Sequence, residues 1–109
     1  MVRRHIQTEE SIARLASEFL ARSGDARALV TVTHAELSDK RTHVTIFLSV
    51  LPHTQEEEAL KAAKRVRSDF RSYIQKRSFL RPTPIVDFEL DYGEKNRQRV
   101  DDLTRKKAV

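Results

Sequence analysis

The feature that most restricts the fold of this chain is a strictly alternating segment from Thr42 to Leu51. Alternate residues of a strand point to opposite faces of its sheet, so this pattern predicts a strand with one buried face and one wet face. Val and Thr also dominate residues 29–37, and the short polar turn 38–41 joins the two segments. We therefore predict an antiparallel hairpin over residues 29–51, ended by Pro52.

Helical periodicity on both sides of the hairpin predicts helices that cover its sheet. Apolar residues recur every three or four positions over residues 8–23, which begin with a Thr that can cap the helix. A second periodic stretch covers residues 54–78 and opens with the pattern of a capping box, Thr54 to Glu57. One straight helix would turn Arg67 toward its apolar side, so we predict a bend at residues 66–68 that makes a helix pair.

A third strand is predicted after a loop that contains Pro82 and Pro84. Residues 85–91 alternate again, with apolar side chains at the even positions and two acidic side chains between them. The tail 94–109 is polar. The order α-β-β-α-α-β predicts one α+β domain over residues 1–109, in which helices pack on one face of a three-stranded sheet.

Positive charge is concentrated in one part of the chain. There are 21 Lys and Arg against 16 Asp and Glu, a net charge of +5. The segment from Lys61 to Arg81 holds eight basic residues and one acidic residue, a net charge of +7, so the rest of the chain carries −2. On a helical wheel most of these basic residues project away from the apolar side. We call the eight the basic stripe: Lys61, Lys64, Arg65, Arg67, Arg71, Lys76, Arg77 and Arg81.

The charge pattern alone leaves two explanations of the basic stripe open. Concentrated positive charge on a small domain is typical of proteins that bind nucleic acid, and a merely solvated helix face carries the same pattern. A membrane surface is disfavoured, because the segment lacks the opposite face rich in Trp, Phe and Leu that interfacial helices use. If the partner is nucleic acid, all eight residues are candidate RNA-binding positions.

Catalytic and metal chemistry find little support in the sequence. The absence of Cys excludes disulfides and thiolate sites. His34 and His43 could approach each other across the hairpin, but a metal site needs about four ligands. The two glycines cannot form a glycine-rich phosphate loop. We expect no enzyme, no cofactor and no metal, and, since no signal peptide or long apolar segment is present, a cytoplasmic protein.

Phe47 is the one aromatic residue that we expect as a stacking platform for a base, because it lies on the outer sheet face. A contact with a partner, or partial cover by the tail, explains its position equally well. RNA-recognition motifs need two or three such rings on one sheet, and this sheet does not supply them.

Residues 80–91 carry the strongest resemblance to a known family. Their sequence, Leu-Arg-Pro-Thr-Pro-Ile-Val-Asp-Phe-Glu-Leu-Asp, resembles the pattern L-R-x-x-P-x-x-x-F-x-x-D of ribosome-binding factor A, a bacterial small-subunit assembly factor. Residues 32–38 and the apolar pair Val100 and Leu103 match further family features in the same order. The resemblance extends over about residues 4–103, and it implies a type II KH-like fold.

The resemblance implies that the protein binds the immature small ribosomal subunit and its ribosomal RNA during late maturation, without catalysis. The basic stripe would then lie along phosphates, and the missing GxxG loop implies that the four-nucleotide clamp of ordinary KH domains is absent. Val66-Arg67-Ser68 stands where the family has a kink of the form Ala-x-Gly. An assembly GTPase stays open as a second partner, and we expect a monomer because no spare apolar face is evident.

Two other functions stay open on the residues alone. The first is a generic KH-like module that binds single-stranded RNA. The second is a protein-interaction domain whose basic helix docks an acidic partner.

Overall fold

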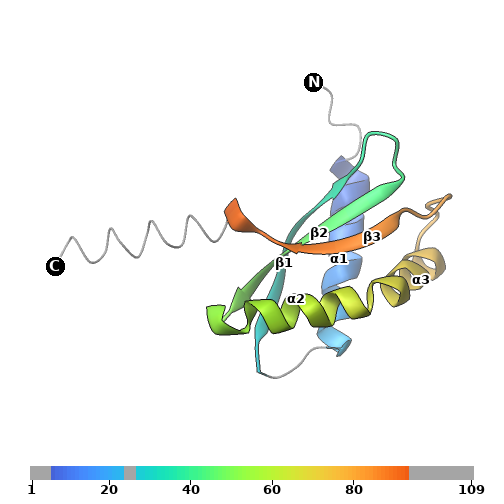
Figure 1. The fold of residues 1–109 in the computed structure, drawn as a ribbon. Coiled ribbons are helices and arrows are strands. Elements are labelled where there is room, and N and C mark those ends of the chain that lie inside the picture. The colour runs from blue at the N-terminus through green and yellow to red at the C-terminus, as the bar shows by residue number, and fades with distance from the viewer. Residues whose placement is uncertain (1–5, 24–26, 94–109) are drawn as a thin grey trace.

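The computed structural model describes residues 6–23 and 27–93 (Figure 1). Over these residues, the predicted order α-β-β-α-α-β is confirmed, with one short 3-10 turn added after the hairpin. The elements are α1 (Ile6–Ser23), β1 (Leu29–Leu37), β2 (His43–Leu51), η1 (His53–Gln55), α2 (Glu56–Arg65), α3 (Arg67–Arg77) and β3 (Ile85–Leu90). The predicted tail 94–109 lies outside the described residues.

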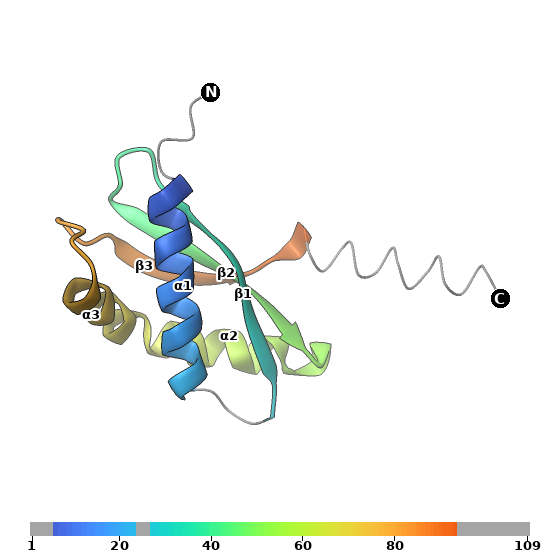
Figure 2. The same ribbon diagram turned by 180° about the vertical axis from the view of Figure 1, so that it is seen from behind.

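The three strands form a mixed sheet in the order β1-β2-β3. β1 and β2 are the predicted antiparallel hairpin, and β3 pairs with β2 in parallel after the crossover through α2 and α3. α1 lies behind the sheet in Figure 1 and in front of it in Figure 2, while α2 and α3 follow one another beside β3 in both views.

One core joins all three helices to the same face of the sheet. The predicted inward residues of β2 and β3 are buried in it, which confirms both alternation patterns. Helical residues of α1, α2 and α3 complete the cluster, so the helices pack on one face as expected. The core contains Ile12, Ala16, Ala35, Leu37, Val44, Ile46, Leu48, Ala63, Phe70, Ile74, Val86 and Phe88.

A β-bulge at Thr33 decides which residues of β1 face the core. The pairing with β2 shifts between Val32 and His34, which leaves Thr33 as the extra residue. Beyond the bulge, Ala35 and Leu37 are buried. Without the extra residue, His34 and Glu36 would point inward in place of Ala35 and Leu37, because a shift of one residue exchanges the two faces of a strand.

The predicted starts of two helices are wrong. α1 begins at Ile6, so Thr8 lies inside the helix rather than capping it. α2 begins at Glu56 and has no side-chain cap, because Thr54 belongs to the 3-10 turn, in which the Gln55 N–H donates to the Pro52 carbonyl. The end of β3 also falls one residue early, at Leu90.

The predicted bend in the second helical stretch is confirmed. α2 ends at Arg65, and Val66 leaves helical geometry with φ −105° and ψ 13° before α3 begins at Arg67. The break turns Arg67 outward, where its side chain is 51% exposed and lies 3.5 Å from an oxygen of Asp87. A straight helix would have brought this guanidinium toward the core, and the break avoids that cost.

Candidate nucleic-acid interface

The members of the basic stripe differ in exposure, and several of them bond to other parts of the protein. Lys64 and Arg71 are only partly exposed. The exposed members are Lys61, Arg65, Arg67, Lys76, Arg77 and Arg81.

Lys64 joins α2 to β3. Its ammonium donates hydrogen bonds to Asp87 at 2.8 Å and to Glu89 at 3.2 Å, and its side chain is 32% exposed. The bond to Asp87 raises the pKa of Lys64 above its ordinary value of 10.5, against an opposing effect of burial. Burial raises the pKa of Asp87, but the bonds from Lys64 and from the Phe88 N–H, with nearby positive charge, leave that pKa below its ordinary value of 3.8.

Replacing Lys64 by Met is expected to lower the free energy of unfolding by about 1 kcal/mol near neutral pH, because Glu89 loses its bond to the ammonium and Asp87 keeps only the longer contact with Arg67. Because folding lowers the pKa of Asp87, its ion pair stabilises the protein at any pH above the unfolded-state pKa, and this stabilisation is lost as the pH falls through the folded-state pKa. Because folding raises the pKa of Lys64, its ion pair stabilises the protein at any pH below the unfolded-state pKa, and this stabilisation is lost as the pH rises through the folded-state pKa. The difference between wild type and variant should therefore be constant from about pH 5 to 9 and shrink toward both ends.

The measurement is urea unfolding of both proteins between acid and neutral pH. Lys61→Met is the matched control, since Lys61 lies one turn earlier and pairs with Glu57 and Glu58 at 3.5 and 4.0 Å on the exposed surface. That control should cost only a few tenths of a kcal/mol. A Lys64→Met loss that does not change between pH 3 and pH 7 would contradict the assigned ion pair.

Arg71 holds the loop between α3 and β3. Its Nε donates to the Pro84 carbonyl at 3.2 Å, and Nη2 donates to the Thr83 carbonyl at 2.8 Å. Thr83 and Pro84 are buried, so these carbonyls need an internal partner. The helical wheel places Lys64 and Arg71 away from the core, and neither belongs to the core. The wheel does not show that both side chains reach across to β3 and its loop.

Arg81 closes the end of α3 with three main-chain contacts. Nη1 donates to the Leu80 carbonyl at 2.7 Å and to the Ser78 carbonyl at 3.4 Å, while Nη2 donates to the Gln75 carbonyl at 2.9 Å. A cation at this position also stabilises the negative end of the helix dipole. Arg81 therefore shapes the loop while its side chain stays at the surface.

Arg65 and Lys76 are the most available cations of the basic stripe. Each lies in the last turn of its helix, Arg65 in α2 and Lys76 in α3, and both are exposed. Within ranges 6–23 and 27–93, neither side chain has a hydrogen-bond or ion-pair partner. Arg77, next to Lys76, is placed over the Tyr73 ring at 4.4 Å. The two successive helices thus each end in an exposed cation, and such charges suit phosphates.

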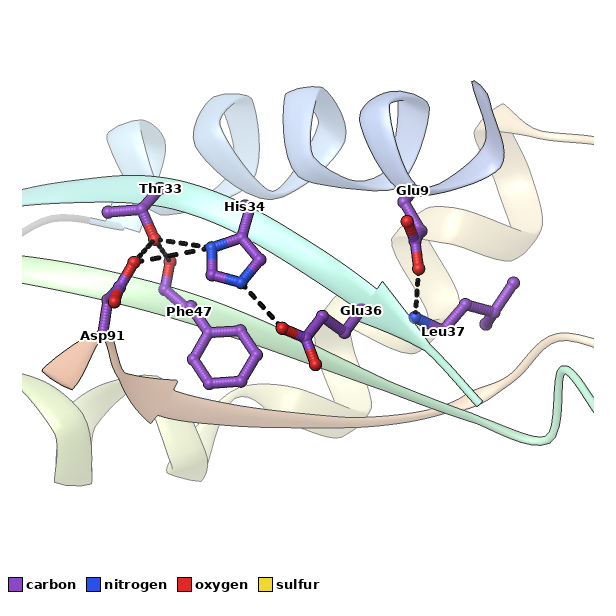
Figure 3. Close-up of polar contacts among 7 residues, drawn as sticks. All are labelled: Glu9, Thr33, His34, Glu36, Leu37, Phe47 and Asp91. Carbon is purple, nitrogen blue, oxygen red and sulfur yellow. Dashed lines mark hydrogen bonds and ion pairs between the residues drawn. The ribbon is translucent and has the colours of Figure 1, made fainter. Parts of the chain in front are cut away.

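The outer face of the sheet carries a different chemistry (Figure 3). His34 stacks on Phe47, with ring centroids 4.5 Å apart and an interplanar angle of 7°, and its Nε2 lies 2.9 Å from Glu36. Thr33 donates to Asp91 at 2.6 Å and lies 3.1 Å from the other nitrogen of His34. The predicted platform at Phe47 therefore already has a stacking partner. Acidic groups surround it, which disfavours phosphate.

The suggested approach of His34 to His43 is wrong, because the register pairs His34 with Phe47. Among the described residues, no group of His, Asp and Glu could hold a metal ion. The cluster around His34 could not be found from the sequence, since the bulge at Thr33 decides which side chains of β1 share the outer face.

Phe79 is an exposed aromatic residue that the sequence did not predict, since only Phe47 was expected outside the core. It lies in the loop after α3 and is fully exposed. The signal available in the sequence was its position just beyond the periodic apolar stretch, outside any predicted buried face.

A model of the family described as ribosome-binding factor A matches residues 4–104 of the chain. The chain belongs to the ribosome-binding factor A family. A ribosome-binding factor A from Coprothermobacter proteolyticus is 30% identical over 84 residues, which cover 73% of this chain and 61% of that relative. The chain spans about half the length of some other curated members of the ribosome-binding factor A family.

Solved structures of ribosome-binding factor A share the fold. The crystal structure of ribosome-binding factor A from Thermus thermophilus has a TM-score of 0.71 at 23% identity, covering 78% of this chain and 93% of that one. A homology model of the Thermus thermophilus protein, fitted into a cryo-EM map of its complex with the 30S subunit, has a TM-score of 0.66 at 23% identity and covers 74% and 88%. The α+β fold expected from the resemblance is confirmed.

In the part of the chain that the structure describes, no helix is long and apolar enough to cross a bilayer.

Proposed function

We propose that this protein binds the small ribosomal subunit during its maturation by contacting ribosomal RNA through the basic stripe. The observation that carries the proposal is the pair of exposed cations at successive helix ends, Arg65 and Lys76, in a member of this family. Neither has a partner among residues 6–23 and 27–93. The similar Thermus thermophilus fold that was fitted into a 30S complex supports it. The function is binding without catalysis, by a cytoplasmic monomer formed from one domain.

The eight residues of the basic stripe divide into two roles under this proposal. Lys61, Arg65, Lys76 and Arg77 contact phosphates directly, because their charges reach solvent at the helix surface. The others add positive potential while they hold the sheet edge and the loop: Lys64, Arg67, Arg71 and Arg81. Phosphate contacts position a protein but carry no sequence information, so RNA shape supplies the specificity.

RNA approaches from the helices rather than from the outer sheet face. On that face Glu36 and Asp91 flank His34, and the two cations nearest to it, Lys64 and Arg67, are paired with Asp87 and Glu89, so little positive charge is left there for phosphates. An assembly GTPase stays a second proposed partner, and it rests on the family resemblance alone.

Co-sedimentation with ribosomal fractions tests the proposal. The tagged protein is run on sucrose gradients at low and moderate salt, with and without nuclease. We expect it in the fraction of free small subunits and not with translating ribosomes, and we expect binding to weaken steeply as salt rises. A protein that stays at the top of the gradient under all conditions would contradict the proposal.

The same experiment separates the alternatives. A generic module for single-stranded RNA would bind a short isolated oligonucleotide as well as it binds the subunit. A domain that docks an acidic protein would keep its partner after nuclease treatment.

A further inference from the structure

Phe79 is the most exposed large apolar residue of the described chain. Its relative exposure is 102%, so the whole ring lies in solvent. The segment that carries it joins α3 to β3 at the right-hand edge of Figure 1. An exposed phenylalanine adds nothing to the core, and its neighbour Leu80 packs against the core instead.

The main chain around Phe79 is firmly held. On one side, Ser78 donates its hydroxyl to the Ile74 carbonyl at 2.9 Å, and its oxygen accepts the Leu80 N–H at 3.3 Å. On the other side, the buried Thr83 hydroxyl donates to the Leu80 carbonyl at 3.3 Å. The main chain that carries the ring is therefore already ordered, and binding a ligand there costs little further backbone conformational entropy.

Positive charge borders the ring along the sequence. Lys76 and Arg77 form the last turn of α3 just before it, and Arg81 follows two residues later. Lys76 has no partner among the described residues, so its charge is free to pair with a ligand. A flat apolar ring whose neighbours in the sequence are cations suits a ligand that combines a flat ring with negative charge, and an unpaired nucleotide has both.

We infer that Phe79 stacks on an unpaired base of the bound RNA while Lys76 holds a phosphate of the same strand. This inference rests on the proposed function and adds that the RNA contacted by this loop is single-stranded. Base stacking on an aromatic side chain tolerates any sequence, because every base has a π-face. Phe79 thus selects an exposed base, whereas the cations alone would accept any phosphate.

A tryptophan at position 79 tests the inference, because the chain has no other Trp. Phe79→Trp is titrated with purified small ribosomal subunits, with a short unstructured RNA and with a duplex RNA of equal length. We expect the subunit to quench the Trp emission strongly, the unstructured RNA to quench it only at much higher concentration, and the duplex to quench it weakly at any concentration. The affinity of Phe79→Trp for the subunit should equal or exceed that of the wild type.

Phe79→Ala completes the test, and its far-ultraviolet circular dichroism melt should match the wild type because the ring contributes no buried area. We expect its affinity for subunits to fall by about 5- to 150-fold. Unchanged affinity in Phe79→Ala overturns the inference while the proposed function stands. A blue-shifted, enhanced Trp emission on the subunit also overturns it, since that signal marks an apolar protein pocket. If wild-type protein fails to bind subunits at all, the proposed function falls, and the inference falls with it.

Discussion

Replacing Arg65 and Lys76 together by Gln is expected to weaken binding to small ribosomal subunits by about 25-fold at 0.1 M monovalent salt. Each cation that neutralises a phosphate of single-stranded RNA contributes about 0.7 to the slope of log affinity against log salt. Losing two contacts should therefore reduce that slope by about 1.4. Gln is preferred to Glu because an acid in the last turn of a helix opposes the helix dipole and would add a stability effect.

Two control variants make this result specific. Arg65→Lys with Lys76→Arg keeps both charges and should bind within about twofold of wild type, because phosphate contacts depend mainly on charge. Arg14→Gln with Lys40→Gln removes the same net charge from exposed positions in α1 and the hairpin turn. If this last variant weakens binding as much as the test variant, general electrostatic attraction explains the effect and the assigned contacts are wrong.

The same design could not use Lys64 and Arg71. Both belong to the basic stripe, but Lys64 binds Asp87 and Glu89, and Arg71 binds two main-chain carbonyls. Changing their charge would damage β3 and the loop before it. Any loss of binding would then report on folding as well as on RNA contact.

Phe70→Ala is expected to lower the free energy of unfolding by about 3–5 kcal/mol, the usual cost of emptying a large aromatic site in a core. Phe70 is completely buried. Its ring centroid lies 5.3 Å from that of Phe19, 6.3 Å from that of Tyr73 and 6.0 Å from that of Phe88. One side chain therefore joins α1, α3 and β3, and its removal should also loosen the loop that leads to β3.

Urea unfolding followed by circular dichroism measures this loss, which should lower the melting temperature by roughly 12–20 °C. Phe79→Ala is the matched control, because it removes the same side chain from an exposed position and should change stability by no more than about 0.5 kcal/mol. A Phe70→Ala variant as stable as that control would show that the aromatic cluster does not hold α3 to the sheet.

Much of the fold follows directly from local patterns. The alternation in β2 and β3 predicted which residues are buried, because successive side chains of a strand point to opposite faces. Arg67 predicted the bend, because an uninterrupted helix would have buried a guanidinium. The helix starts were less certain, since Thr8 and Thr54 match capping patterns but the main chain satisfies the helix ends differently.

The candidate site was only partly predictable. Composition located the basic stripe, because eight cations fall within 21 successive residues. Composition could not show which cations are bonded to other parts of the protein, because the partners of Lys64 and Arg71 lie 12 to 25 residues away in sequence. It also missed Phe79, whose exposure depends on how the loop before β3 is tied down.

The sequence by itself determined the order of the elements, the buried faces of β2 and β3, and the place where positive charge gathers. These properties depend on periodicity and composition over short distances. Only the tertiary structure decided that Thr33 forms a bulge, that Lys64 and Arg71 bond to β3 and the loop before it, and that Arg65, Lys76 and Phe79 remain available to a ligand. The reason is physical: a side chain is free or engaged according to what the folded chain brings beside it, and strand pairing sets those neighbours.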